Sequence, residues 1–138
     1  MKLSLPLTLV FLFLFSCKDP VIIEPEPSMS PPVWLIGNWL HSDSTTAVVE
    51  KMIVSDDDIV LERFPSTGKT SMSVIDSCKT NNITLSDYIK YNSYYSLEFT
   101  KENEDSVHII YYAKISDAEI RIINEVSPTP KTYTRQEN

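Results

Sequence analysis

Hydrophobic and polar residues alternate in short runs from Trp34 to the end of the chain. The clearest run is Tyr94–Thr100, in which Tyr95, Leu97 and Phe99 share one face and polar residues dominate the other. A period of two is typical of a half-buried β-strand. Clusters of Ser, Asn and Asp separate the runs and predict turns. No window shows a sustained helical period, so the pattern indicates an all-β domain.

The pattern predicts nine short strands. They are Asn38–Ser42, Ala47–Val54, Asp58–Phe64, Ser71–Ile75, Asn82–Leu85, Tyr94–Thr100, Ser106–Ile115, Glu119–Asn124 and Lys131–Gln136. Short strands joined by hairpin-length turns favour an antiparallel up-and-down meander. We therefore expect the meander to close into a barrel of about eight strands, a size that holds either packed side chains or one small ligand.

The alternation also predicts which side chains face the interior. In two neighbouring strands these residues are Tyr95, Leu97, Phe99, Ile109 and Tyr111. They would line an apolar ligand pocket with a few hydroxyl groups, or they would simply fill the core of a small domain. Tyr94 and Tyr112 would then face outward and form a patch for protein or glycan contact.

The chain begins with a short targeting pattern. Lys2 precedes an apolar stretch, Leu3–Phe15, of 13 residues. This stretch is too short for a bilayer span, which needs roughly 20 residues, but it fits a secretory signal peptide.

The end of that stretch, Leu14-Phe15-Ser16-Cys17, resembles the lipobox of a bacterial lipoprotein. The resemblance implies that residues 1–16 are removed and that lipid chains on Cys17 anchor the mature protein to a membrane. Two or more acyl chains give firm attachment. We expect residence at the outer membrane, on its periplasmic face or at the cell surface.

Residues 17–33 predict a spacer. Five prolines lie between residues 18 and 33, and proline both fixes φ and lacks an N–H donor. Such a segment is a semi-rigid connection. The expected organisation is therefore a signal peptide over residues 1–16, a lipidated spacer over residues 17–33 and one β-domain over residues 34–138.

Charge and cysteine content narrow the function further. The formal net charge is −7, which argues against nucleic-acid binding. If Cys17 is acylated, Cys78 is the one remaining cysteine, and no disulfide is available within the chain. Cys78 is expected to be a small buried residue.

Two short motifs carry a family resemblance. The first predicted strand contains Gly37-Asn38-Trp39, a GxW motif, and the last contains Tyr133-Thr134-Arg135. With the lipobox and the meander, they make the chain resemble the small lipocalin-like lipoproteins of Bacteroidota. The resemblance implies that Trp39 lies at the base of the barrel and that Arg135 lies across its ring, a cation–π contact of roughly 0.5–2 kcal/mol.

Residue patterns that would indicate catalysis are weak. His41 and His108 have no metal-ligand spacing, and Asp56-Asp57-Asp58 lacks the spacing and glycine of a calcium loop. We therefore expect neither an enzyme nor a cofactor. The first hypothesis is a lipid-anchored lipocalin-like lipoprotein that binds a small apolar or amphipathic ligand. The second is a surface-displayed protein- or glycan-interaction module with a filled core, such as an inhibitor or assembly accessory.

Overall fold

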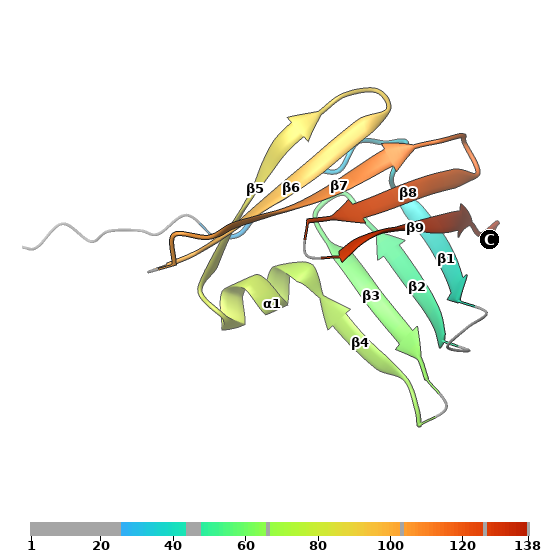
Figure 1. The fold of residues 1–138 in the computed structure, drawn as a ribbon, viewed down its shortest axis with the longest axis horizontal. Helices are drawn as coiled ribbons and strands as arrows, with labels where there is room; N and C mark the ends of the chain where they lie inside the picture. The colour runs from blue at the N-terminus through green and yellow to red at the C-terminus, as the bar shows by residue number, and fades with distance from the viewer. Residues whose placement is uncertain (1–25, 44–47, 66, 103, 126, 138) are drawn as a thin grey trace, which may run out of the picture.

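A computed structural model describes residues 26–43, 48–65, 67–102, 104–125 and 127–137. The predicted signal peptide and Cys17 lie outside these residues. The described chain forms one antiparallel sheet and one helix (Figure 1). The elements are β1 (Gly37–Asp43), β2 (Val48–Val54), β3 (Ile59–Phe64), β4 (Thr70–Ser73), α1 (Val74–Thr80), β5 (Ile83–Lys90), β6 (Tyr94–Lys101), β7 (Val107–Lys114), β8 (Glu119–Asn124) and β9 (Ser127–Arg135).

The sheet confirms the antiparallel meander and corrects the expected closure. Its nine strands follow the order β4-β3-β2-β1-β9-β8-β7-β6-β5. The first and last strands pair through Trp39 with Arg135 and Leu40 with Thr134. The sheet curls through 245° and remains an open half-barrel, with β4 and β5 as its two edges.

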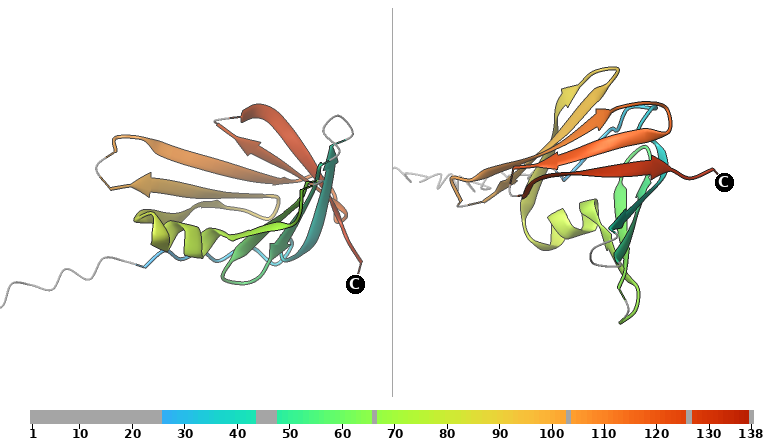
Figure 2. Two further views of the ribbon diagram at one scale, coloured as in Figure 1. Left: turned by 90° about the horizontal axis from the view of Figure 1, so that it is seen from below. Right: turned by 45° about the vertical axis from the view of Figure 1, so that its right-hand side comes forward.

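Helix α1 explains where the sheet opens. It connects β4 to β5 and contacts β3, β4 and β5 (Figures 1 and 2). Its Val74 and Cys78 are buried in the core, so the helix covers the gap that direct pairing of β4 with β5 would have closed. Burial of Cys78 agrees with the sequence-based expectation.

The helix was not predicted, and Ser71–Ile75 was assigned wholly to a strand. Local signals for the helix are nevertheless present. Ser73 is the N-cap, and its Oγ accepts a hydrogen bond from the Asp76 backbone N–H at 3.0 Å, as is typical of a helix start. Asp76 in the first turn and Lys79 in the last turn suit the helix dipole. A helix of seven residues is too short to produce a detectable period.

Strands β5 and β9 are longer than predicted. β5 extends to Lys90, and its pairing with β6 contains an irregularity between Asp87 and Ile89, which breaks the alternation there. The start of β9 contains prolines, which lack the N–H donor of a regular strand, and the predicted strand began only at Lys131.

Residues 26–36 pack against the sheet. Met29 and Leu35 are buried, and the Ser30 backbone N–H and Oγ both donate to the Asp87 carboxylate. Lys90 Nζ donates to the Ser30 carbonyl oxygen at 2.6 Å. Met29 and Ser30, which lie within the predicted spacer, therefore contact the β-domain.

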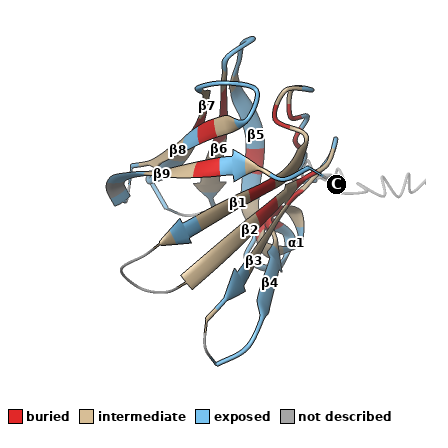
Figure 3. Cartoon of the chain, turned by 90° about the vertical axis from the view of Figure 1, so that its right-hand side faces the viewer, coloured by how far each residue is buried: buried red, intermediate tan, exposed pale blue. Residues whose placement is uncertain are grey.

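The core lies on the concave side of the sheet. Its fully buried residues include Trp39, Met52, Tyr95, Leu97 and Ile120, and Figure 3 shows buried stretches midway along β1, β2, β8 and β9. The ends of the strands are more exposed, so any space for a ligand lies where the concave face extends beyond the packed core.

Candidate functional site

The concave face holds a cavity of about 370 Å³. Its lining comes from two separated parts of the sheet, β2 and β3 on one side and β7, β8 and β9 on the other. The apolar lining residues are Met52, Leu61, Ile110, Tyr112, Ile122 and Tyr133, and the polar ones are Glu50, Arg63, Asn124, Ser127, Thr129 and Lys131. The curl of the sheet brings the two groups together.

Four of these residues form one hydrogen-bonded group, which we call the Glu50 cluster: Glu50, Arg63, Lys131 and Tyr133. Lys131 Nζ lies 2.9 Å from both carboxylate oxygens of Glu50. The Tyr133 hydroxyl donates to the same carboxylate at 2.8 Å, and Arg63 Nε lies 3.1 Å from it. Charged donors on a carboxylate make strong hydrogen bonds, so the cluster joins β2, β3 and β9.

The position of the cluster follows from strand pairing. Glu50 faces Arg63 across the β2–β3 ladder. The paired residues of β1 toward β9 are Trp39 and Leu40. The next residue of β1, His41, is paired with Glu50 of β2, so the cluster lies level with His41, just beyond the paired part of β1 and β9. There His41 Nδ1 lies 2.8 Å from the Thr132 carbonyl oxygen, and Lys131 and Tyr133 reach Glu50 on β2. Side chains thus connect the strands beyond the paired residues of β1 and β9.

The surroundings of the Glu50 cluster stabilise the ionised form of Glu50 and the neutral form of Tyr133. Burial alone raises the pKa of Glu50, but hydrogen bonds from Lys131 and Tyr133 and the charges of Lys131 and Arg63 outweigh it, so the net pKa is lowered. Burial, and then the nearby Glu50 carboxylate, raise the pKa of Tyr133. At neutral pH the carboxylate is therefore ionised and the phenol is protonated.

We expect the substitution Glu50→Gln to reduce stability at neutral pH and to matter less in acid. A carboxylate whose folded pKa lies below its unfolded value contributes stability above the unfolded pKa and loses that contribution as the pH falls through the folded pKa. The expected loss at neutral pH is about 1 kcal/mol. Urea unfolding of both proteins at neutral and acidic pH measures the difference. A difference that does not shrink in acid would contradict this account.

A second hollow adjoins the cluster on the outside. It has a volume of about 540 Å³ and shares Glu50, Arg63 and Lys131 with the inner cavity. Its other lining residues are Asp43, Val48, Pro65 and Thr70. The Glu50 cluster therefore lines both the inner cavity and this outer hollow.

The predicted lining residues divide into two groups. Tyr95 and Leu97 are fully buried, and Phe99 packs against the same core. They contribute to the packed interior instead of to the cavity. The Tyr95 hydroxyl donates to Asp87, the carboxylate that also holds Ser30, so it fastens residues 26–36 to the sheet.

Ile109 and Tyr111 face away from the core, which corrects their predicted orientation. The register pairs Tyr95 with Tyr112 and Leu97 with Ile110, and residues directly opposite each other share a face. Since β7 has apolar residues on both faces from Ile109 to Ala113, its own alternation did not decide the orientation. Pairing with β6 decides it, and places Ile110 and Tyr112 inside.

The two tyrosine pairs consequently lie on opposite faces. Tyr95 and Tyr112 pair inside, with ring centroids 5.9 Å apart. Tyr94 and Tyr111 pair on the convex face at 6.0 Å, where Tyr94 and Tyr112 had been expected. Ser96, which is paired with Tyr111 and lies two residues after Tyr94 on the same face, is fully buried.

Trp39 and Arg135 are brought together. Arg135 Cζ lies 4.3 Å from the centroid of the Trp39 ring, and the two residues face each other across β1 and β9. The Trp39 Nε1–H donates to the Leu35 carbonyl oxygen at 2.8 Å. Arg135 also donates to the carbonyl oxygens of Trp34, Ile36 and Asp117, so it joins the approach to β1 with the β7–β8 turn.

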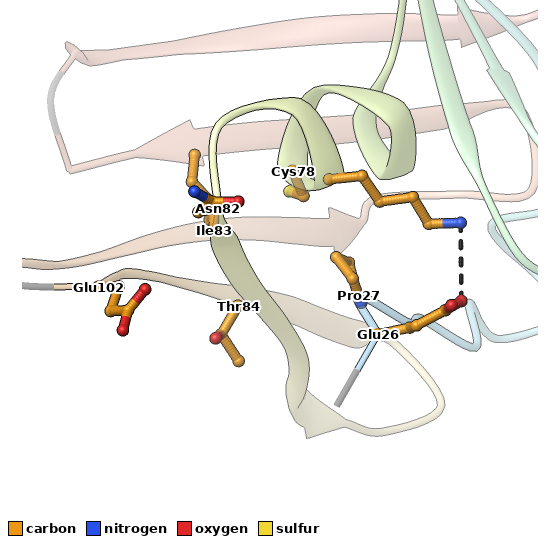
Figure 4. A pocket seen from close by; sticks show the side chains of 8 residues that line it. Glu26, Pro27, Cys78, Asn82, Ile83, Thr84 and Glu102 are labelled. Carbon is orange, nitrogen blue, oxygen red and sulfur yellow. Dashed lines mark ion pairs between the residues drawn. The ribbon is translucent and has the colours of Figure 1, made fainter. Parts of the chain in front are cut away.

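Another pocket, of about 350 Å³, lies beside α1 and the start of β5 (Figure 4). Cys78 lines it, together with Lys79, which forms an ion pair with Glu26 at 3.7 Å. Burial and then the charge of Asp58 raise the pKa of the Cys78 thiol, and a protonated thiol is a poor nucleophile. The concave cavity offers more apolar lining and a sheltered charge cluster, so we regard it as the candidate binding site.

Among the described residues, no three His, Cys, Asp or Glu side chains come together in a way that would hold a metal ion. The same residues include no helix with the length and hydropathy of a transmembrane span.

Comparisons of the chain with models of known protein families, with curated proteins and with solved structures found no match.

The Glu50 cluster was not predicted from the sequence. Glu50, Arg63 and Lys131 occur in three different strands, and each looks like an ordinary exposed charge in its own run. A usable signal was present in β2, where Glu50 shares a face with Met52. A carboxylate on the inward face of a strand needs a charged partner.

Proposed function

We propose that this chain is a lipid-anchored, lipocalin-like lipoprotein that binds a small apolar or amphipathic ligand without catalysis. The concave cavity carries the proposal. Its volume of about 370 Å³ falls within the range of roughly 300–1,000 Å³ that small-molecule sites occupy. Apolar walls with a few convergent polar groups are also typical of such sites.

The properties of the Glu50 cluster support binding over catalysis. A general acid or base works best when its pKa lies near the working pH. Glu50 has a lowered pKa and Tyr133 a raised one, so both move away from neutrality. The cluster is suited to holding charges in place.

The lipocalin-like assignment rests on the ends of the sheet. Gly37 and Trp39 begin β1, Arg135 ends β9, and the arginine lies on the indole ring. An antiparallel meander joins them. The open side between β4 and β5 is a departure from a closed lipocalin barrel.

Filling the cavity tests the proposal. Ile110→Trp adds a large side chain to the cavity wall, so we expect it to weaken binding of the neutral fluorescent probe phenylnaphthylamine by about tenfold or more. Ile109→Trp is the matched control, because the neighbouring residue lies on the convex face. Equal binding by the wild type and both variants, or no binding by the wild type, would overturn the proposal.

The anchor has its own test. We expect Cys17→Ala to abolish incorporation of radioactive palmitate in the bacterial host and to release the protein from membranes, because the acylated thiol is lost. Cys78→Ala, which removes the buried cysteine, should leave labelling unchanged. Continued labelling of the Cys17→Ala protein would refute the lipid anchor and, with it, residence at the outer membrane.

The second candidate is a surface-displayed interaction module. The ring pair of Tyr94 and Tyr111 on the convex face favours it, since tyrosine is enriched in protein interfaces. Under this alternative, Ile109→Trp would disturb partner binding and Ile110→Trp would not, which is the reverse of the pattern expected for the cavity.

A further inference from the structure

We propose that the cavity selects ligands with one negative group and an apolar body. The negative group would be held by Arg63 and Lys131, and the apolar body would lie over Ile110 and Ile122. This inference rests on the proposed function and adds the chemical class of the ligand.

Exposure within the Glu50 cluster supports the choice of sign. The Glu50 side chain is 12% exposed, whereas Arg63 is 60% exposed and Lys131 is 42% exposed. An incoming group therefore meets the cations first. Glu50 already accepts hydrogen bonds from Lys131 and Tyr133, so a ligand cation would have to displace bonded donors from a sheltered carboxylate.

The charge balance points the same way. Among the residues that line the inner cavity, Arg63 and Lys131 are positive and Glu50 is negative, which leaves an excess of one positive charge at neutral pH. The whole chain has a net charge of −7. The cavity is therefore a locally positive site on an acidic protein. Because the net charge of the whole chain repels anions, a preference for anions would have to come from Arg63 and Lys131 themselves.

Glu50 also holds the cations in position. Lys131 comes from β9 and Arg63 from β3, and both contact the same carboxylate. Fixing two flexible cations before the ligand arrives reduces the conformational entropy lost on binding. A carboxylate or sulfonate that enters from the outer hollow would meet Arg63 and Lys131 there, because both residues also line that hollow.

The apolar part of the ligand has a defined place beyond the cations. Met52, Leu61 and Ile110 line the inner cavity, and Tyr112 and Ile122 complete its apolar surface. A neutral apolar molecule would gain binding free energy from this surface alone. An anionic amphipathic molecule would gain it from both the apolar surface and the two cations, and the difference in affinity can be measured.

Two fluorescent probes with the same aromatic body form the test. Anilinonaphthalene sulfonate carries one negative charge, and phenylnaphthylamine is its neutral counterpart. We expect Arg63→Gln and Lys131→Gln each to weaken binding of the sulfonate by about tenfold and to change binding of the neutral probe by less than about twofold. Circular dichroism and thermal unfolding of each variant verify folding. Because Arg63 is the more exposed of the two cations, Arg63→Gln is the variant expected to disturb folding less.

Two further variants sharpen the test. Glu50→Gln keeps a side-chain oxygen that can accept from Lys131 and Tyr133, so the cations stay in position, but it removes the competing negative charge. Sulfonate binding should therefore strengthen several-fold. A purely structural role of the cluster would weaken binding instead. Lys69→Gln is the control for net charge, since Lys69 is similarly exposed but pairs with Glu62 and does not line the cavity. It should leave both affinities unchanged.

The outcomes distinguish failure of the anionic selectivity from failure of the proposed function. If the neutral probe binds and Ile110→Trp removes it, but Arg63→Gln and Lys131→Gln leave sulfonate binding unchanged, the proposed function stands and the anionic selectivity is wrong. If Lys69→Gln weakens sulfonate binding as much as Arg63→Gln does, the selectivity is likewise wrong. If neither probe binds to the wild type, both proposals fail.

Discussion

Arg135→Ala is expected to lower the free energy of unfolding by about 3 kcal/mol. The substitution removes the guanidinium from the Trp39 ring. It also removes the donors to the carbonyl oxygens of Trp34, Ile36 and Asp117. Solvent reaches part of this region, so we expect less than the sum of the individual contributions. Urea unfolding followed by tryptophan fluorescence measures the change as a lower midpoint.

The control for this prediction is Arg121→Ala. Arg121 is an exposed arginine on β8, so its loss should change stability by no more than about 0.5 kcal/mol. Arg135→Lys keeps the charge but removes the planar group that both stacks and donates in several directions. It should therefore recover only a minor part of the lost stability. Equal stability of Arg135→Ala and Arg121→Ala would show that the Trp39–Arg135 contact contributes nothing measurable.

Gly37→Ala should destabilise the protein more than Gly68→Ala. Both glycines have positive φ, +140° for Gly37 and +131° for Gly68, so each alanine introduces backbone strain of about 1–3 kcal/mol. A Cβ at Gly37 would lie 2.8 Å from Arg135 Nη1, whereas a Cβ at Gly68 would have no atom within 4 Å. The extra cost at Gly37 should be about 1–2 kcal/mol, because the new methyl group displaces a hydrogen-bonded guanidinium.

The double variant Gly37→Ala with Arg135→Ala isolates that extra cost. If the methyl group acts by displacing Arg135, the combined loss should be smaller than the sum of the two single losses. Strictly additive losses would mean that strain at Gly37 is the whole effect. The experiment would also explain the glycine of the GxW motif, because that glycine leaves the space that the arginine needs beside the tryptophan.

Much of the fold could be predicted because its signals are local. Alternation identified all nine strands, and the turn residues between them predicted an antiparallel meander. Errors occurred where local signals were short or interrupted. α1 has only seven residues, and the irregular pairing near Asp87 hid the second half of β5.

The site was predicted only in part, and the reason is geometric. A strand such as β7, with apolar residues on both faces, does not specify which face is buried, and only its register with β6 places Tyr112 inside and Tyr111 outside. A one-residue change of register reverses every side chain. Trp39 and Arg135 were paired in advance only because a family resemblance suggested it.

By itself, the sequence determined the all-β class, the positions of the strands and the acidic character of the chain, because propensity, alternation and charge are properties of short segments. The tertiary structure decided that the sheet stays open at α1 and which residues surround the cavity. It also brought Glu50, Arg63 and Lys131 together from β2, β3 and β9. These outcomes depend on how far the sheet curls and on which distant strands become neighbours, and such long-range contacts leave no pattern within any one segment.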